Sequence, residues 1–255
     1  MSGQWLSKRT GASGAPRRLF CFGHAGGGTG FFAHLRSRLL PEIETCPVQL
    51  PGRAPRLAER PYTRVADLVP DAVAGLTPYL DRPYAILGHS VGAVMAYEVA
   101  RALAAGRGRT GTRGPECLFV SGRRGPRVPM RRPTLHHLPD EEFLAAVTEF
   151  NGIPENMAEH QELLDLFMPA VRADFELNET YAELPGPELS CPVVAMSGSE
   201  DPEVTANEMA AWREVTLQPC TVRLFDGDHF YLAGAKPEFL DLVRTHLHGL
   251  VSPQT

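Results

Sequence analysis

The stretch Gly88-His89-Ser90-Val91-Gly92 constrains the fold of this chain more than any other part of the sequence. It lies between an apolar run at residues 84–87 and a longer apolar segment at residues 93–100. The first predicts a buried strand and the second a helix, so Ser90 would lie on the tight turn between them. Gly-x-Ser-x-Gly in this setting is typical of a nucleophile elbow, where strand and helix approach closely on either side of the serine. The alternative is a glycine-rich turn whose serine merely faces solvent.

A second glycine-rich turn, Gly23-His24-Ala25-Gly26-Gly27-Gly28-Thr29-Gly30, follows the apolar run at residues 18–22. Its glycine spacing does not fit the Gly-x-Gly-x-x-Gly pattern of dinucleotide sites, and it lacks the Gly-Lys-Ser/Thr ending of a phosphate-binding loop. We expect an oxyanion loop, whose backbone N–H groups would point toward the nucleophile. An ordinary turn between strand and helix is the alternative.

Strands and helices alternate along most of the chain. Further strands are predicted at residues 46–50, 117–121, 192–197 and 220–225, with helices at about 65–80, around Trp212 and at about 237–248. This alternation predicts an α/β fold with a mostly parallel central sheet flanked by helices and joined by right-handed crossovers. We assign residues 17–130 and 183–250 to this core, and residues 1–16, rich in Gly, Ser and Ala, to a disordered tail.

No strand is predicted between residues 121 and 192, which is far more than a crossover needs. Apolar residues recur there at helical spacing, so residues 131–182 are expected to form a helical lid inserted into the core. Such stripes are often ordinary core, but the underside of a lid would receive an apolar substrate chain. The candidate substrate-binding side chains are Phe143, Phe150, Phe167, Met168 and Phe175.

Three residues fit the order serine, acid, histidine, each just after a predicted strand: Ser90, Asp201 and His229. Acyl transfer of this type uses a nucleophile, a histidine base and an acid that orients the base. We therefore predict these three as the catalytic triad.

Other acids and histidines fit these positions less well. Glu200 has a longer side chain than Asp201, and Asp226 and Asp228 are too close in sequence to His229 to orient it. Asp174, in the insertion, is expected to be structural and paired with a nearby arginine such as Arg172. Of the other histidines, His24 belongs to the glycine loop and His89 is next to Ser90, where it points elsewhere on the turn. No strand end positions His136 and His137, and the C-terminal helix contains His246 and His248.

Composition excludes several classes of function. The net charge of −5 argues against a nucleic-acid binder, which needs a clustered positive surface. The five cysteines are scattered without a Cys-x-x-Cys pair, which disfavours zinc and redox sites and suggests reduced thiols in a cytoplasmic protein. No stretch is long and apolar enough to predict a membrane span, and the first residues lack the apolar core of a signal peptide.

Four stretches together resemble the type II thioesterases, stand-alone α/β-hydrolases that work beside polyketide synthases and nonribosomal peptide synthetases. They are Cys21-Phe22-Gly23-His24-Ala25-Gly26-Gly27, Gln49-Leu50-Pro51-Gly52-Arg53, Gly88-His89-Ser90-Val91-Gly92-Ala93 and Asp228-His229-Phe230. Three lid segments, Leu138-Pro139-Asp140, Asn151-Gly152-Ile153-Pro154 and Arg172-Ala173-Asp174-Phe175, are also similar. The sequence departs from the family at Gly23, where proline is common, and in a longer loop at residues 104–115.

The resemblance implies an α/β-hydrolase that releases acyl groups from the phosphopantetheine arm of acyl or peptidyl carrier proteins. It implies an oxyanion hole formed by the backbone N–H groups of Ala25 and Val91. It also implies that no metal or other cofactor is needed, and we expect a monomer.

An arginine-rich stretch, residues 123–132, leads into the lid, with arginines at positions 123, 124, 127, 131 and 132. It would suit docking of an acidic carrier protein, although a solvated loop explains it equally well. Three other functions stay open from the residues alone. They are a small-molecule carboxylesterase, a hydrolase-like binding protein and a terminal thioesterase domain cut from a synthase.

Overall fold

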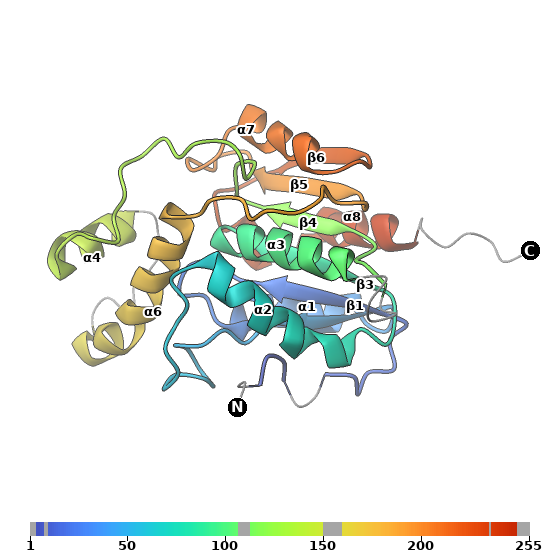
Figure 1. Ribbon diagram of the computed structural model, residues 1–255, viewed down its shortest axis with the longest axis horizontal. Coiled ribbons are helices and arrows are strands. Elements are labelled where there is room, and N and C mark those ends of the chain that lie inside the picture. Colours follow the sequence, from blue (N-terminus) through green and yellow to red (C-terminus); the bar gives the residue numbers. More distant parts are fainter. Residues whose placement is uncertain (1–3, 8–9, 107–112, 150–159, 235, 249–255) are drawn as a thin grey trace, which may run out of the picture.

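A six-stranded, wholly parallel sheet with the order β2-β1-β3-β4-β5-β6 forms the centre of the protein (Figure 1). The computed structural model describes residues 4–7, 10–106, 113–149, 160–234 and 236–248. The strands are β1 (Arg17–Phe22), β2 (Ile43–Pro47), β3 (Tyr84–His89), β4 (Leu118–Ser121), β5 (Val193–Gly198) and β6 (Cys220–Phe225). The predicted α/β-hydrolase architecture is confirmed.

Helices cover both faces of the sheet, which explains why its inner strands are continuous apolar runs. The core helices are α1 (Ala33–Leu39), α2 (Val65–Leu76), α3 (Val91–Ala105), α7 (Ala206–Ala210) and α8 (Pro237–His248). Short 3₁₀ helices lie at Thr29–Phe32, Thr77–Tyr79, Ala211–Val215 and Tyr231–Gly234. In the part of the chain that the structure describes, no helix has the length and apolar character needed to cross a membrane.

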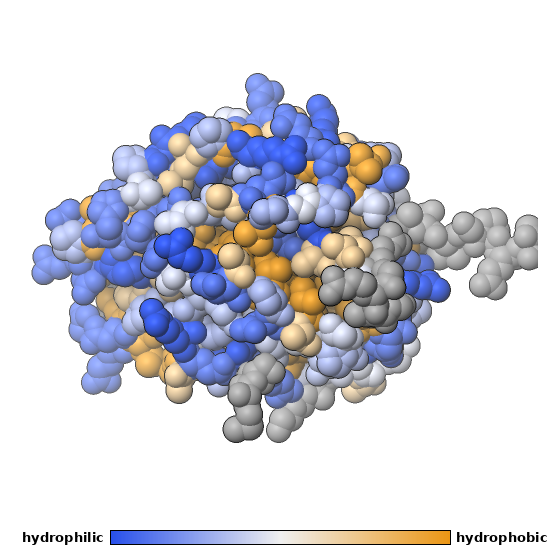
Figure 2. All heavy atoms as spheres, in the orientation of Figure 1, coloured by the Kyte–Doolittle hydropathy of each residue, from blue (hydrophilic) through white to orange (hydrophobic). Residues whose placement is uncertain are grey.

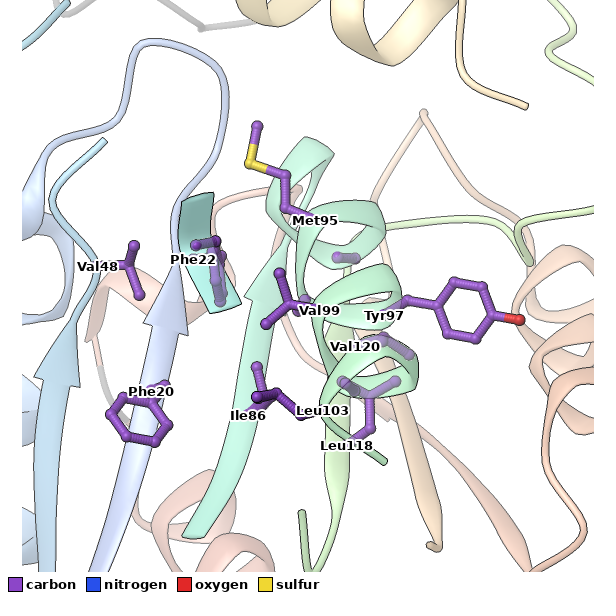
Figure 3. Close-up of a cluster of buried hydrophobic side chains, with 14 of the residues drawn as sticks. Phe20, Phe22, Val48, Ile86, Met95, Tyr97, Val99, Leu103, Leu118 and Val120 are labelled. Carbon is purple, nitrogen blue, oxygen red and sulfur yellow. The ribbon is translucent and has the colours of Figure 1, made fainter. Parts of the chain in front are cut away.

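Alternate residues of each strand enter two separate cores, as the period of two in a strand requires. Phe20, Ile86 and Leu118 face α2 and α3 on one side of the sheet, and Figure 3 shows Val99 and Leu103 of α3 on the same side. Their neighbours, which include Leu19, Ala85 and Phe119, face α1 and α8 on the other side. These two cores hold the carboxyl ends of the strands in place.

Strand β2 begins and ends three residues earlier than predicted. It pairs with β1 from Ile43 to Pro47 instead of occupying residues 46–50. Pro47 has no N–H to donate, so the regular ladder stops there, and only Val48 N–H still reaches the Cys21 carbonyl.

The expected disorder of residues 1–16 is wrong for the N-terminal residues that the structure describes. Trp5 and Leu6 are buried in the core, and the Trp5 carbonyl accepts a hydrogen bond of 2.8 Å from Gln49 N–H. The Trp5 ring fills space left by Gly75 on α2, and the Arg56 guanidinium lies 5.0 Å from its centre. One aromatic side chain therefore fixes a segment whose composition is otherwise typical of a tail.

Helices α4 (Asp140–Glu149) and α6 (Gln161–Glu179) form the helical insertion, here called the lid, at the left of Figure 1, beyond the carboxyl ends of the strands. They share a small apolar core of Phe143, Val147, Leu164, Val171 and Phe175. The predicted insertion thus contains the expected helices. Phe150 and the segment 151–154 lie outside the described residues.

Candidate active site

Ser90 lies between β3 and α3 with φ 57° and ψ −125°, and among the described residues no other non-glycine residue has a positive φ. Such a backbone is strained and is found mainly at functional turns. A Cβ at Gly88 would lie 2.2 Å from the Gly92 carbonyl oxygen, and one at Gly92 would lie 2.3 Å from that of Phe22. The two glycines are therefore required by close approach, and Ser90 N–H is held by the Ser121 carbonyl at 2.8 Å.

His229 and Asp201 meet at the ends of β6 and β5. His229 Nδ1 lies 2.9 Å from Asp201 Oδ2, which leaves the His229 Nε2 free to take a proton. Asp201 also accepts hydrogen bonds from Ser197 Oγ at 2.6 Å and Glu203 N–H at 2.9 Å. Burial by itself would raise the pKa of Asp201, but these bonds and the His229 contact outweigh burial and hold the pKa below its usual value.

Ser90 and His229 line one pocket of about 50 Å³. Its other lining residues come from the glycine loop, the lid and the strand ends: His24, Ala25, Arg132, Val147, Val171, Phe175, Glu203 and Phe230. Three parts of the chain that are distant in sequence therefore enclose the predicted nucleophile and base. Across the described residues there is no cluster of three or more His, Cys, Asp or Glu side chains that could hold a metal ion.

Two further imidazoles lie beside His229. Burial, and then the neighbouring His229, lower the pKa of His24 to about 4, and the same effects hold the pKa of His89 well below its ordinary value. His89 Nδ1 lies 3.0 Å from Ser121 Oγ, and the His89 ring centre is 5.0 Å from that of His229. Because both rings stay neutral near pH 7, they bring no positive charge close to the His229 imidazole.

The glycine loop offers a backbone donor next to Ser90. Gly26 N–H donates to Asp174 Oδ2 at 2.7 Å, and Gly27 N–H donates to the His24 carbonyl at 2.8 Å. By contrast, the N–H groups of Ala25 and Val91 donate to no other described residue. Val91 is the first residue of α3, where N–H groups have no partner within the helix. These two N–H groups are the donors that the predicted oxyanion hole would use.

The predicted lid residues take different places. Phe175 lines the pocket of Ser90, whereas Phe143 is buried behind it, with the two ring centres 5.3 Å apart. Met168 faces a cavity between α4 and α6, and Phe167 contacts Gly26. The other residues of the lid helices that line the pocket are Val147 and Val171. Both belong to the same apolar stripes, so the stripes indicated the right helices but not the inward face.

A second, apolar cavity of about 350 Å³ lies beside the lid helix α6. It is lined by Gly26, Gly28, Thr29, Gly30, Gly52, Arg53, Ala54, Leu57, Leu163, Leu166 and Phe167. Leu163 and Leu166 are 45% and 51% exposed, and Figure 2 shows hydrophobic atoms at the lower left, over the first turns of α6. Ser90 does not line this cavity, and the two spaces share no lining residue.

Asp174 is paired with an arginine, as predicted, but its partner is Arg53 and not Arg172. The two form a bidentate pair, with both distances 3.0 Å. Arg172 pairs with Asp140 instead and donates to the carbonyls of His136 and Leu138. Residues two apart on a helix point in different directions, which explains why Arg172 and Asp174 do not meet.

The arginine-rich stretch does not present a free positive surface. Arg123 is buried, and burial lowers its pKa to about 9. Arg127, Arg131 and Arg132 form ion pairs with Glu183, Glu208 and Glu203, respectively. The charge available for docking a carrier protein is therefore smaller than the sequence indicates.

Comparison with known proteins agrees with this geometry. The family model described as "Thioesterase domain" matches residues 17–247. The chain belongs to the thioesterase family. It is 39% identical to thioesterase PikA5 of Streptomyces venezuelae, over 96% of this chain and 86% of that protein. It is 35% identical to the gramicidin S biosynthesis protein GrsT of Aneurinibacillus migulanus, over 98% of this chain and 96% of that protein.

Among solved structures, the type II thioesterase BorB from the borrelidin biosynthetic cluster is similar to this thioesterase. The TM-score is 0.85 at 35% identity, over 97% of this chain and 99% of that one. This thioesterase is therefore a serine-type thioester hydrolase with the α/β-hydrolase fold.

Proposed function

We propose that this thioesterase hydrolyses short acyl groups from the phosphopantetheine arm of acyl or peptidyl carrier proteins, acting as a stand-alone editing enzyme in the cytoplasm. The observation that carries the proposal is that His229, which is paired with Asp201, lines one pocket with Ser90 on its strained turn. The membership of the family and the biosynthetic relatives support the carrier-bound substrate. The five free cysteines are compatible with a reducing compartment.

Ser90 is the proposed nucleophile. Its oxygen attacks the thioester carbonyl carbon while His229 Nε2 takes its proton, and Asp201 holds the resulting imidazolium. The N–H groups of Ala25 and Val91 stabilise the negative oxygen of the tetrahedral intermediate, and each such donor is typically worth about 3–4 kcal/mol. The intermediate then expels the pantetheine thiolate, which recovers the proton from His229.

Water completes the reaction. His229 takes a proton from a water molecule that attacks the acyl carbonyl on Ser90, and the acid is released when the proton returns to Ser90. A thiol has a pKa near 8.5, so the leaving group needs little protonation compared with an amine. These steps need no metal or organic cofactor.

The size of the pocket supports short acyl groups. Holding one water molecule takes roughly 10–15 Å³ of such a cavity, so a cavity of about 50 Å³ accommodates only a few non-hydrogen atoms. Val147, Val171 and Phe175 close it from the lid side. Acetyl and propionyl groups fit this space, whereas longer chains require α6 to move.

A panel of acyl carrier proteins tests the proposal. The panel extends from acetyl to a long acyl chain, with a nitrophenyl ester as the oxygen-ester comparison. We expect the highest kcat/KM for the shortest carrier-bound groups. Equal or better turnover of the nitrophenyl ester would instead favour a small-molecule carboxylesterase. We expect a monomer, to be checked by sedimentation.

A further inference from the structure

A buried carboxylate on the lid contacts the oxyanion loop directly. Asp174 lies on α6, is 2% exposed, and accepts the Gly26 N–H at 2.7 Å. Arg53, in the loop after β2, donates to both Asp174 oxygens at 3.0 Å. Bonds between charged groups, and from N–H groups to a carboxylate, are among the strong ones in proteins. Three separate parts of the fold therefore meet at one carboxylate.

This contact fixes the orientation of the peptide that follows Ala25. Gly26 has φ +69°, and a Cβ there would lie 2.5 Å from Phe167 and 2.7 Å from Val171, both on α6. The Gly27 N–H is held by the His24 carbonyl on the other side. Ala25 thus lies between a peptide whose carbonyl is held within the loop and a peptide whose N–H is held by the lid.

The same helix bounds the acyl pocket. Val171 and Phe175, on either side of Asp174 in α6, line the pocket of Ser90. An acyl group too large for the pocket must push these side chains, and Asp174 moves with them because all three belong to one helix. The Asp174–Gly26 bond is then lengthened in the same movement that enlarges the pocket.

We propose that Asp174 is a positioning residue that couples the conformation of the oxyanion loop to the position of the lid. Long acyl chains would then be turned over with a lower kcat, while their KM would stay nearly the same. The inference rests on the proposed oxyanion hole and acyl pocket. A short acyl group leaves α6 in place and Ala25 aligned. A long acyl group still binds to the apolar lid, but the oxyanion loop no longer has its hydrogen bond from Gly26 N–H to Asp174.

The test uses one variant that removes both buried charges and one that keeps an acceptor for the Gly26 N–H. The double variant Arg53→Met/Asp174→Leu replaces both charged side chains by apolar ones, which buried ion pairs often tolerate. The single variant Asp174→Asn retains an oxygen that can accept the Gly26 N–H. Asp140→Asn is the matched control, because it breaks a lid ion pair to Arg172 that does not touch the oxyanion loop.

Acetyl and octanoyl thioesters of N-acetylcysteamine are the substrates, and a short alkylboronic acid serves as the tetrahedral analogue. In the double variant we expect kcat for the acetyl substrate to fall by about 100-fold and for the octanoyl substrate by less than about fivefold, with KM nearly unchanged. The Ki of the boronic acid should rise by a similar factor of about 100. Asp174→Asn should recover most of the acetyl rate, and Asp140→Asn should behave as wild type.

An equal loss of kcat for the two chain lengths, or an unchanged Ki for the boronic acid, overturns the inference, because a merely structural pair would produce those results. The outcome is separate from that of the proposed substrate. Failure to hydrolyse acyl carrier proteins would refute the proposed function, while the boronic-acid measurement would still report on the Asp174–Gly26 link.

Discussion

His229 and Asp201 are joined by a 2.9 Å contact between Nδ1 and Oδ2, at the ends of two adjacent parallel strands, β6 and β5. The contact occupies Nδ1, so Nε2 is the imidazole nitrogen that can act as the proposed base. Asp201 also accepts hydrogen bonds from Ser197 Oγ and Glu203 N–H. These donors are needed because a buried carboxylate with unsatisfied lone pairs is costly.

Replacing Asp201 by asparagine should lower kcat by about 10³–10⁴-fold, because an amide no longer holds the imidazole in the required tautomer or stabilises its charged form. KM should change little. Steady-state hydrolysis of an acetyl thioester measures the effect. Glu200→Gln is the control, since Glu200 is exposed and adjacent. Similar losses in the two variants would contradict the assignment of Asp201.

Gly88→Ala and Gly92→Ala should each destabilise the protein by about 1–3 kcal/mol or more, because the added methyl group overlaps a backbone carbonyl. Urea unfolding measures the change. Gly28→Ala is the control, since nothing lies within 4 Å of a Cβ at that position. If all three variants were equally stable, the close approach of α3 to β3 and β1 would be wrong.

Stability should fall as the pH is lowered from 6.5 to 4, because unfolded His24 binds a proton in this range and buried His24 does not. Its pKa of about 4 in the folded state corresponds to about 3 kcal/mol relative to an ordinary histidine. Burial of His89 acts in the same direction. Asp201, whose pKa is lowered, adds a loss only at still lower pH, as it becomes protonated.

The variant His24→Gln should reduce the slope of unfolding free energy against pH in that window by about one proton. Above pH 7.5 the His24 imidazole is neutral in both the folded and the unfolded state. The difference in unfolding free energy between the variant and the wild type should therefore be constant there. A slope identical to that of wild type would show that His24 is not buried in its neutral form.

Trp5→Ala should cost about 3–5 kcal/mol of stability, as is typical for a buried tryptophan. Gln4→Ala, at an exposed position, should have no measurable effect. Chemical denaturation of both variants provides the comparison. A loss below about 0.5 kcal/mol for Trp5→Ala would restore the view of a disordered tail.

The sequence predicted those features that depend on local pattern. Apolar runs located the strands, and the glycines around Ser90 indicated the elbow. Asp201 and His229 were found because each follows a strand, and parallel strands bring their ends to one edge of the sheet. The comparisons then confirmed the family that four short motifs had suggested.

Features that depend on distant contacts were not predictable in the same way. Arg53 and Asp174 are 121 residues apart in the sequence. Which face of a lid helix points toward the pocket is determined only when the lid packs on the core. The same holds for Trp5, whose burial depends on Gly75 on α2. Residues that enclose the pocket from the lid, Val147 and Val171, were hidden within stripes that also cover the lid's own core.

The central claim, release of a short acyl group from a carrier protein through Ser90, is tested most directly by a single-turnover reaction. Acetyl-loaded carrier protein is mixed with excess thioesterase, and the carrier's free thiol and released acetate are followed by intact mass and chromatography. We predict complete deacylation by the wild type and none above background by the correctly folded Ser90→Ala variant. Deacylation by Ser90→Ala at the wild-type rate, or an inert wild type, would contradict the account.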